Sequence, residues 1–400
     1  MSANSPTRIA VLGSTGSVGQ ATLDIVRRNR DLLQVTALTA RGNTAELISQ
    51  ANEFRPEVVC VESPELAPVV ERELGGRVSV LSGSEGLEQC IGQTTATAVV
   101  VGIVGFAGLS AVLAAIKSGK HVALANKESL VAGGGLVIEA LRASKVKLVP
   151  VDSEHSTIYR CLERNASTAD VRRIILTASG GPFLRLSEEE LRFVTPSDAI
   201  RHPRWRMGPK ISVDCATMMN KGLEVIEASW LFELPGDKID ILIHPESVVH
   251  GMVEYQDGMI VSGLSDTDMR APIAFALERL RRESADASPD AIGSGVSFLN
   301  WAELGRLHFA EPDAQQATVL ALCYDALREG GTVPAVLNAA NEEAVCAFLH
   351  EEISFLDITR VVREVVESYT NTKIGTLSDV LIADAWGREQ ASKIIRARGI

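Results

Sequence analysis

The alternation of short apolar runs with amphipathic stretches over the first 150 residues most constrains how this chain can fold. The first apolar run, Arg8–Leu12, leads into a glycine-rich turn and then into an amphipathic stretch. Strands that alternate with helices in this way form a parallel sheet covered by those helices. We therefore predict an α/β fold with a Rossmann-like, doubly wound parallel sheet, its strands being Arg8–Leu12, Gln34–Thr39, Val58–Val61, Val78–Leu81, Ala98–Val101 and His121–Leu124.

The glycine-rich turn Gly13–Gly19 predicts a dinucleotide site. Its GxxGxxG spacing differs from the usual GxGxxG, but it lies between a strand and a helix, where backbone N–H groups cradle phosphate. An NAD-binding unit places an acid after the second strand for the ribose hydroxyls. No acid occurs over residues 34–43, and Arg41 is found there instead. A cation at this place suits a 2′-phosphate, so we expect NADP(H), the alternative being an ordinary surface arginine.

Length, charge and cysteine content limit the class of protein. A chain of 400 residues is long enough for two or three domains. The formal net charge of −12 argues against nucleic acid or an anionic membrane as the main partner. The six cysteines contain no CxxC pair, which is typical of reduced thiols in the cytoplasm. The polar N-terminus contains no signal peptide pattern.

The uncharged run Ile91–Ile116 is long enough to span a bilayer. Gly102, Gly105 and Gly108 interrupt it, and several threonines lie within it. A strand, a glycine turn and a helix buried against a parallel sheet explain this run better. We therefore expect no membrane span.

Two carboxylates follow an apolar run that ends at Val151. On an extended backbone, residues two apart point to the same side, so Asp152 and Glu154 could aim at one cation. The alternative is a solvated loop with two acids. Lys127, in the polar stretch Ala125–Ser129, follows another strand, where ligands of such sheets bind. That stretch could also be an ordinary first turn of a helix.

Three stretches after residue 170 suggest anion chemistry. The run Arg173–Ala178 reads as a strand that leads into Ser179-Gly180-Gly181, a compact turn able to bind an anion. Residues 199–210 are basic, contain Trp205 and are interrupted by prolines, so we predict a mobile lid over an anionic substrate. Residues 211–215 are expected to be a strand, which gives way to a helix near Ala216.

On that helix, Asn220 and Glu224 are four residues apart and share a face. Glu224 could supply a third carboxylate to Asp152 and Glu154. Further strands are expected at Ile239–Ile243 and Val248–Tyr255. The predicted domains are 1–150 for NADPH, 151–283 for catalysis, a linker over 284–311, and a C-terminal four-helix bundle over 312–400 with helices near 313–329, 334–350, 357–369 and 377–397.

Taken together and in order, five motifs resemble those of the 1-deoxy-D-xylulose 5-phosphate reductoisomerase family. They are Gly13–Gly19, Ala125–Ser129, Pro150–His155, Ala178–Phe183 and Met218–Glu224. The resemblance implies an NADPH- and divalent-metal-dependent enzyme, with Mn²⁺ or Mg²⁺. Such an enzyme converts 1-deoxy-D-xylulose 5-phosphate to 2-C-methyl-D-erythritol 4-phosphate in the non-mevalonate route to isoprenoids. The family is usually a homodimer, and we expect one here.

The resemblance also implies roles for individual residues. The expected metal ligands are Asp152, Glu154 and Glu224, and the expected catalytic residues are Lys127 and Glu154. The substrate would be bound by Lys127, Ser153, Glu154, Ser179, His202, Trp205, Met207, Cys215, Asn220, Lys221 and Glu224. NADPH would be bound by Thr15, Gly16, Ser17, Val18, Arg41, Gly42, Asn43, Asn126, Glu128 and Gly208.

One residue departs from the family pattern. Cys215 is found where the family has serine in the phosphate pocket, and a thiol is the weaker hydrogen-bond donor. Cys215 is also the feature that keeps an alternative open, another NADP-dependent two-domain dehydrogenase such as a semialdehyde dehydrogenase, which uses a cysteine nucleophile. A non-catalytic NADP sensor is a third hypothesis, but it would not need three converging carboxylates.

Overall fold

The computed structural model describes residues 5–163, 170–201, 204–205, 207–283 and 289–398. The chain packs into two compact units. Unit 1 comprises Met1–Asn126, Val137–Ser156 and Asp268–Ser297, and unit 2 comprises Lys127–Leu136, Thr157–Thr267 and Phe298–Ile400. The helices α6 (Lys127–Arg142) and α7 (Ser153–Glu163) contain residues of both units.

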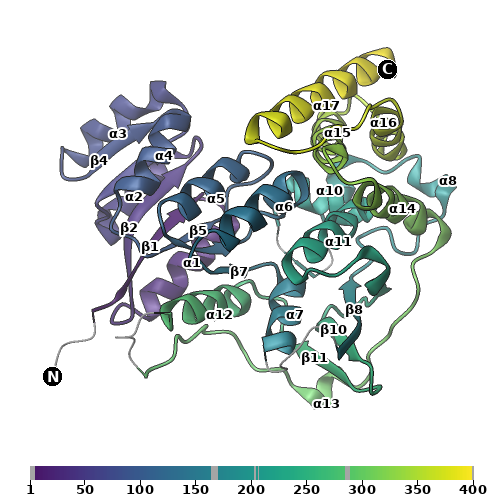
Figure 1. Cartoon of the computed structure of the whole chain (residues 1–400), viewed down its shortest axis with the longest axis horizontal. Helices are drawn as coiled ribbons and strands as arrows, with labels where there is room; N and C mark the ends of the chain where they lie inside the picture. Colours follow the sequence, from purple (N-terminus) through teal and green to yellow (C-terminus); the bar gives the residue numbers. More distant parts are fainter. Residues whose placement is uncertain (1–4, 164–169, 202–203, 206, 284–288, 399–400) are drawn as a thin grey trace. The chain divides into compact units, whose positions relative to one another are not determined.

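Unit 1 is built on a parallel sheet, as predicted, and its seven strands have the order β4-β3-β2-β1-β5-β6-β7. Figure 1 shows this sheet among the helices of unit 1. Its strands are continuous apolar runs because helices cover both faces, and Ile9, Val99 and Val122 have no exposed surface. The strands are β1 (Thr7–Leu12), β2 (Leu33–Ala40), β3 (Val58–Val61), β4 (Ser79–Ser82), β5 (Ala98–Val101), β6 (His121–Leu124) and β7 (Leu148–Pro150). The helices are α1 (Ser17–Arg28), α2 (Thr44–Phe54), α3 (Ala67–Leu74), α4 (Gly83–Gln93), α5 (Gly108–Lys117) and α12 (Arg270–Arg281).

The strand order reverses between β1 and β5, and ligands of open α/β sheets bind at such a point. The glycine-rich turn after β1 lies there. Gly13 has a φ of +76°, and a Cβ added to it would lie 2.7 Å from the carbonyl oxygen of Gly102, which follows β5. Glycine is therefore required for the two loops to approach each other.

Unit 2 contains a mixed sheet of four strands in the order β11-β10-β8-β9. In the sequence, helices lie between β8 and β9 and again after β11. The strands β8 and β9 run parallel, and β10 is antiparallel to both β8 and β11. Its strands are β8 (Val171–Ala178), β9 (Ile239–Ile243), β10 (Val249–Tyr255) and β11 (Ile260–Leu264). Its central helices are α8 (Glu188–Leu191), α9 (Pro196–Ala199), α10 (Pro209–Thr217) and α11 (Met219–Phe232).

The C-terminal part of unit 2 is helical, as predicted, and Figure 1 shows it in green and yellow. Its helices pack with the rest of unit 2, since a Cβ added to Gly222 of α11 would lie 2.3 Å from Sγ of Cys323. The expected linker over 284–311 contains a short helix, and Ala310 pairs with Ile243 in an antiparallel bridge. The helices are α13 (Trp301–Leu304), α14 (Ala314–Glu329), α15 (Val333–Leu349), α16 (Phe355–Glu367) and α17 (Leu377–Arg398).

Two local predictions were wrong. Residues 211–215 are not a strand but part of α10, because Pro209 fixes a helical φ at its start and Ser212 N donates to Gly208 O at 3.1 Å. The apolar alternation of Ile211 and Val213 imitated a strand. The loop that we expected over 199–210 is also shorter than predicted, since Ala199 is the last residue of α9 and Pro209 is the first residue of α10.

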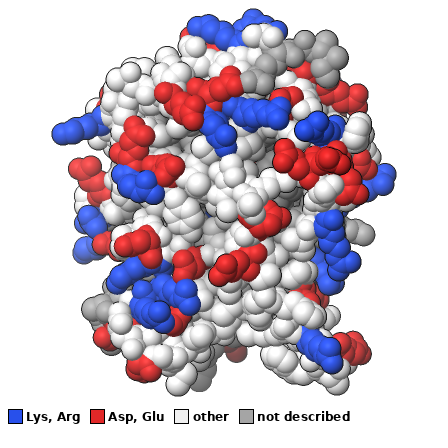
Figure 2. Space-filling model, turned by 90° about the vertical axis from the view of Figure 1, so that its right-hand side faces the viewer, with Lys and Arg blue, Asp and Glu red and all other residues white. Residues whose placement is uncertain are grey.

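The surface and the cysteines agree with the composition. Figure 2 shows basic and acidic side chains interspersed over the face that it presents. Within the described part of the chain, every helix falls short of the length and apolar character that a membrane crossing requires. The expected strand and helix within Ile91–Ile116 are present as β5 and α5, and the six cysteines are free thiols.

Candidate active site

The N-terminus of α1 has the features of an anion-binding site. Gly16 precedes the helix, and among the described residues no side chain caps it. The turn itself is held by β2, since Gly13 N donates to Thr39 Oγ1 at 2.9 Å and Ser14 N donates to Thr39 O at 2.8 Å. Unsatisfied N–H groups and the positive end of the helix dipole suit a phosphate. The residues expected to bind it, Thr15 to Val18, form this turn and the start of α1.

The segment after β2 is exposed. The side chain of Arg41 is 89% exposed, and its Nε lies 3.2 Å from Oε2 of Glu62. Asn43 caps α2, because its Oδ1 accepts a hydrogen bond from Glu46 N at 3.2 Å. Arg41 is therefore accessible to a ligand, whereas the side chain of Asn43 already has a structural role.

Asn126, at the end of β6, also has a structural role. Its Nδ2 donates to the carbonyl oxygens of Ile103 and Gly105 at 2.9 and 2.8 Å. A Cβ added to Gly108 would lie 2.3 Å from Asn126 Oδ1. The side chain thus ties β6 to the loop after β5, at the carboxyl edge of the sheet.

Asp152 and Glu154 come together, but not on extended backbone. The strand β7 ends at Pro150, and Glu154 lies in the first turn of α7. Asp152 starts this helix, because its Oδ1 accepts from Glu154 N at 3.3 Å and its carbonyl accepts from Ser156 N at 2.8 Å. The alternation argument was therefore wrong, although carboxylate oxygens of the two residues lie within 4.8 Å of each other. The hydroxyl of Ser153 donates to Glu154.

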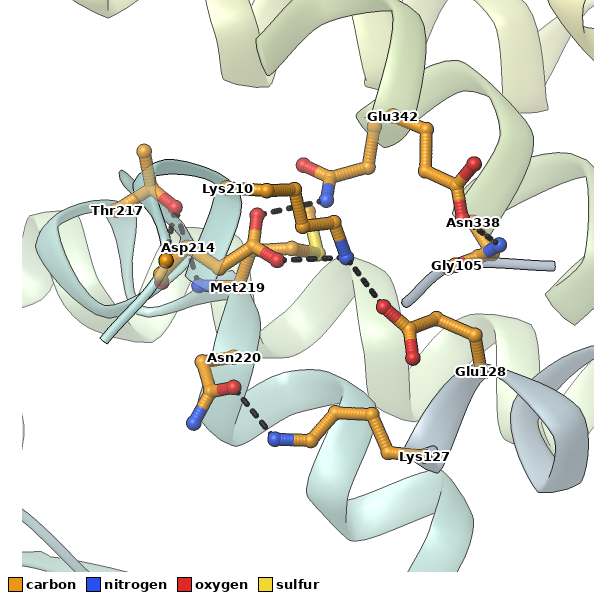
Figure 3. A network of polar contacts seen from close by, with 12 residues as sticks. Gly105, Lys127, Glu128, Lys210, Asp214, Thr217, Met219, Asn220, Asn338 and Glu342 are labelled. Carbon is orange, nitrogen blue, oxygen red and sulfur yellow. Dashed lines mark hydrogen bonds and ion pairs between the residues drawn. The ribbon is translucent and has the colours of Figure 1, made fainter. Parts of the chain in front are cut away.

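Glu224, the third expected ligand, belongs to unit 2 and lies on α11. Its two oxygens collect three donors, the ammonium groups of Lys127 and Lys221 and the amide of Asn220. Lys127 Nζ also donates to Asn220 Oδ1 at 2.6 Å (Figure 3). All four side chains are buried. The four-residue spacing of Asn220 and Glu224 predicted their contact. Only the family resemblance, which assigns Lys127 to the same substrate, connected Lys127 with these two residues.

Close packing of α6 on α11 makes this cluster possible. A Cβ added to Gly134 of α6 would lie 2.3 Å from Cδ1 of Trp230 on α11. A larger residue at position 134 would therefore force the side chain of Trp230 or the helices themselves to move. This contact holds α6 close to α11, so that the side chain of Lys127, at the start of α6, reaches Asn220 and Glu224 on α11.

The Ser179-Gly180-Gly181 turn lies against the end of α10. Gly180 and Gly181 have φ values of +80° and +71°, and Gly181 N donates to Ser179 Oγ at 3.1 Å. A Cβ added to Gly181 would lie 2.7 Å from the carbonyl oxygen of Cys215. The structure thus brings together two of the residues expected to bind phosphate, Ser179 and Cys215.

Part of the expected lid is described. Arg204 Nε donates to Pro245 O at 3.3 Å, and the ring of Trp205 lies 6.0 Å from that of the buried His250. Met207 is half-buried and Gly208 precedes α10. His202, expected to bind the sugar, lies outside the described residues. The described lid residues rest on the turn before β10 and on β10 itself.

Comparison with known proteins decides the family. Three family models match in order: 1-deoxy-D-xylulose 5-phosphate reductoisomerase over residues 9–134, its C-terminal domain over 148–232, and the DXP reductoisomerase C-terminal domain over 264–390. The reductoisomerase of Chlorobium limicola is 46% identical over 388 residues, which are 97% of this chain and 99% of that protein. The chain belongs to the 1-deoxy-D-xylulose 5-phosphate reductoisomerase family.

Solved structures agree with this assignment. The reductoisomerase from Zymomonas mobilis in complex with NADPH has a TM-score of 0.87 and 42% identity, and the match covers 98% of this chain and 99% of that one. A DOX-P reductoisomerase in complex with NADPH, fosmidomycin and magnesium has a TM-score of 0.89 and 38% identity, with 98% of each chain covered. The predicted fold class is confirmed.

Membership of the reductoisomerase family removes the semialdehyde dehydrogenase alternative, and Cys215 gives the physical reason. Burial raises the pKa of the Cys215 thiol to about 12, even though Lys127 and Lys221 oppose the rise. The thiol is therefore protonated at neutral pH, and a protonated thiol is a poor nucleophile.

Sequence reasoning missed a second buried ion cluster beside the first. Lys210 Nζ lies 2.8 Å from Oε1 of Glu128 and 2.8 Å from Oδ2 of Asp214 (Figure 3). Lys210 was expected to belong to the basic lid, and Glu128 to contact NADPH. Neither expectation included the contact that the two side chains make with each other. Lys210 and Asp214 are four residues apart, a spacing that signals a contact only once residues 209–217 are recognised as a helix.

Two carboxylates share the one ammonium of Lys210, and their pKa values diverge. Burial tends to raise the pKa of Glu128, but Lys210 outweighs it and the pKa falls below its ordinary value. Burial raises the pKa of Asp214 despite Lys210 and Asn341. Burial would lower the pKa of Lys210, but Asp214 and Glu128 raise it well above its ordinary value. The ammonium is therefore charged at neutral pH.

Proposed function

We propose that this chain rearranges 1-deoxy-D-xylulose 5-phosphate and reduces the product to 2-C-methyl-D-erythritol 4-phosphate, using NADPH and one divalent cation, in the non-mevalonate route to isoprenoids. One observation carries the proposal furthest: Lys127, Asn220 and Lys221 converge on Glu224 in a buried cluster. Burying two ammonium groups in a chain of net charge −12 is costly unless anionic groups compensate them. An oxygen-rich sugar phosphate is such a partner.

The carboxylates suit a divalent cation. The paired oxygens of Asp152 and Glu154 are hard ligands of the kind that Mg²⁺ and Mn²⁺ prefer. We propose that Asp152, Glu154 and Glu224 hold the ion. When bound, the ion supplies Lewis-acid stabilisation of substrate oxygens that gain negative charge.

NADPH fits unit 1. Its pyrophosphate would lie at the uncapped N-terminus of α1, against Thr15, Gly16, Ser17 and Val18. The exposed Arg41, with Gly42 and Asn43, would bind the 2′-phosphate. Asn126, Glu128 and Gly208 would contact the rest of the cofactor. The bound nicotinamide supplies the hydride that reduces the aldehyde intermediate.

The phosphate of the substrate fits the turn of unit 2 that faces the end of α10. We propose that Ser179, Asn220, Lys221 and the backbone at Cys215 bind it. Ser153 and His202 would contact the sugar, and Trp205 and Met207 would close over it. A fixed phosphate supplies binding energy remote from the carbons that react.

Lys127 and Glu154 are the proposed catalytic residues. Lys127 Nζ can donate a hydrogen bond to a substrate oxygen that gains charge as the carbon–carbon bond breaks and re-forms. The carboxylate of Glu154 can accept a proton from a substrate hydroxyl. Closure of the lid would exclude water while the aldehyde intermediate is held.

A domain division by function accompanies this proposal, with NADPH bound over 1–150, catalysis over 151–283, and the C-terminal helices over 312–400 in support. We also propose a cytoplasmic homodimer. Free cysteines suit a reducing compartment. The assembly state is measured by sedimentation of the purified chain.

Oxidation of NADPH on addition of 1-deoxy-D-xylulose 5-phosphate tests the function. We expect turnover with Mn²⁺ or Mg²⁺ and release of 2-C-methyl-D-erythritol 4-phosphate, identified by mass spectrometry. Fosmidomycin, bound in a related structure, should inhibit it. NADPH oxidation that yields a different product would overturn the proposal.

A further inference from the structure

The helices α10 and α11 meet at a single residue, Met218, and we call residues 217–219 the α10–α11 joint. The φ of Met218 is +70°, in the left-handed region that residues other than glycine rarely adopt. Such a backbone conformation persists only where its surroundings hold it. The proposed phosphate-binding residues Cys215, Asn220 and Lys221 lie within three positions of Met218. The conformation of the joint therefore determines where these groups lie.

The hydroxyl of Thr217 bridges the α10–α11 joint. Its Oγ1 donates to the carbonyl oxygen of Asp214 at 3.1 Å and accepts from Met219 N at 3.3 Å (Figure 3). One hydroxyl thus connects a carbonyl in the last turn of α10 with the first N–H of α11, both of which belong to helix ends. Since Thr217 is only 8% exposed, the hydroxyl is the group that serves them in place of solvent.

A third helix holds Asp214, to which the joint is bonded. Asn341 of α15 has no exposed surface, and its Nδ2 donates to Asp214 Oδ1 at 2.8 Å. Its Oδ1 has no hydrogen-bond partner among the residues that the structure describes. Burying an amide oxygen in this way costs free energy, so packing alone would favour an apolar side chain here. What the amide of Asn341 supplies is the contact with Asp214.

The Ser179-Gly180-Gly181 turn packs against the same end of α10. A Cβ added to Gly181 would lie 2.7 Å from the carbonyl oxygen of Cys215 and 3.0 Å from Cα of Ala216. Contacts this close leave no space for α10 to shift without moving the turn. Both parts of the proposed phosphate site, the turn and the start of α11, therefore depend on how the end of α10 is held.

We infer that Thr217 and Asn341 are positioning residues for the phosphate of the substrate. Thr217 fixes the α10–α11 joint, and Asn341 fixes the Asp214 to which that joint is bonded. Neither side chain is required to touch the substrate. The kinetic consequence rests on the proposed function, whereas the anchoring of the joint does not depend on the substrate.

The chain offers matched controls for both residues. Thr217→Val keeps the shape of the side chain and removes the hydroxyl, whereas Thr217→Ser retains the hydroxyl. Asn341→Leu is compared with Asn338→Leu, because Asn338 is also a fully buried asparagine of α15 whose Oδ1 has no partner among the described residues. Its Nδ2 donates to Glu342 Oε1 at 3.0 Å, one turn further along the same helix. Both leucine variants lose a buried amide, but only Asn341→Leu loses the contact with α10.

The first experiment is hydrogen–deuterium exchange without ligand, measured by mass spectrometry on peptides that cover residues 214–222. We expect exchange there to be at least fivefold faster in Thr217→Val and at least threefold faster in Asn341→Leu than in the unchanged chain. Thr217→Ser and Asn338→Leu should stay within twofold of the unchanged chain. Exchange in Thr217→Val equal to that of the unchanged chain would overturn the inference.

The second experiment measures kcat, KM for 1-deoxy-D-xylulose 5-phosphate and the dissociation constant of NADPH. We expect KM to rise at least tenfold in Thr217→Val and in Asn341→Leu, with a smaller change in kcat, because the phosphate is remote from the carbons that react. The dissociation constant of NADPH should stay within twofold. Thr217→Ser and Asn338→Leu should keep KM within threefold of the unchanged chain.

The double variant with Thr217→Val and Asn341→Leu should have a KM close to that of Thr217→Val alone, because both changes release the same joint. Increases in KM that multiply, an equal increase in Asn338→Leu, or a parallel loss of NADPH affinity would overturn the inference. If Thr217→Val does not fold, the comparison of Asn341→Leu with Asn338→Leu decides in the same way. An inactive unchanged chain would refute the proposed function instead, and the exchange rates would still decide how the joint is held.

Discussion

The ammonium of Lys127 lies 2.6 Å from Oδ1 of Asn220, although 93 positions separate the two residues. The same ammonium reaches Glu224 at 3.3 Å. The start of α6 is thereby joined to the start of α11, and every member of this cluster carries a predicted role in binding or catalysis. If those roles are correct, small changes in the cluster should have large kinetic effects.

Replacing Lys127 with Met should lower kcat/KM for the sugar phosphate by about 100-fold or more, the range of a lost general acid or hydrogen-bond donor. The dissociation constant of NADPH, measured by fluorescence titration, should change little. Lys120→Met serves as the matched control, because Lys120 is also a buried lysine, whose Nζ donates to the carbonyl oxygens of Thr94 and Ala96 at 2.7 and 2.8 Å. A Lys127→Met enzyme with normal kcat/KM would remove Lys127 from the catalytic residues.

Reversing the charge of Arg41 tests the cofactor assignment. Its side chain is 89% exposed, so Arg41→Glu should leave the fold intact. We expect kcat/KM for NADPH to fall at least tenfold while that for NADH stays within about threefold, since only NADPH carries the 2′-phosphate. Arg72→Glu, at a similarly exposed site on α3, should alter neither. An unchanged preference for NADPH over NADH would show that Arg41 does not bind the 2′-phosphate.

Cysteine chemistry should be dispensable. Cys215→Ser restores the hydroxyl that the family has at this position, and we expect kcat/KM within about threefold of the unchanged chain or slightly higher. Burial raises the pKa of Cys60 to about 11 and that of Cys215 to about 12. At pH 7.5, iodoacetamide should therefore alkylate the exposed Cys346 first, as mapped by mass spectrometry. Inactivation that parallels alkylation of Cys215 would revive a thiol mechanism.

Stability in acid should depend on Arg270, which bonds Asp24 at 2.9 Å and Asp268 at 2.7 Å in unit 1. Its hydrogen bond lowers the pKa of Asp268, and for Asp24 it helps to outweigh the effect of burial, so that this pKa also falls. Both contributions to stability are complete well above the ordinary aspartate pKa and disappear as the pH falls through the lowered values.

Arg270→Leu should therefore lower the free energy of unfolding by only about 1 kcal/mol at pH 7, because these groups are partly exposed. The decrease should be smaller at pH 3, where protonation of the two aspartates begins to remove the interaction. Urea titration measures both values. Arg328→Leu breaks an exposed pair with Asp325 and should have no measurable effect at either pH. If the loss of unfolding free energy in Arg270→Leu grew as the pH fell, the assigned role of Arg270 would be contradicted.

The sequence predicted what depends on local pattern. The strand β1 is a continuous apolar run because both faces of its sheet are covered, and its residues Ile9–Leu12 have no exposed surface. The helix α8 begins with a capping box of Ser187 and Glu190, whose three-residue spacing is also a local pattern. Local pattern failed where α10 carries alternating apolar residues, and where Asp152 starts a helix immediately after β7.

Contacts between distant segments could not be predicted. Lys210 and Glu128 are 82 positions apart, and each alone resembles an ordinary charged residue at the start of a helix. Their pairing depends on the packing of α6, α10 and α15, which periodicity does not specify. The resemblance to a known family supplied the residues that are expected to contact ligands, but it did not supply the buried ion pair of Lys210 with Glu128 and Asp214.

The most direct test of the central claim is the metal dependence of NADPH oxidation driven by 1-deoxy-D-xylulose 5-phosphate. A chelator should abolish it, and Mn²⁺ or Mg²⁺ should restore it. Glu224→Gln should need at least tenfold more metal for half-maximal activity, with unchanged NADPH binding. Glu254→Gln, which alters a buried glutamate paired with Arg172 and Arg173, should behave like the unchanged chain. Turnover that persists in excess chelator would contradict the account.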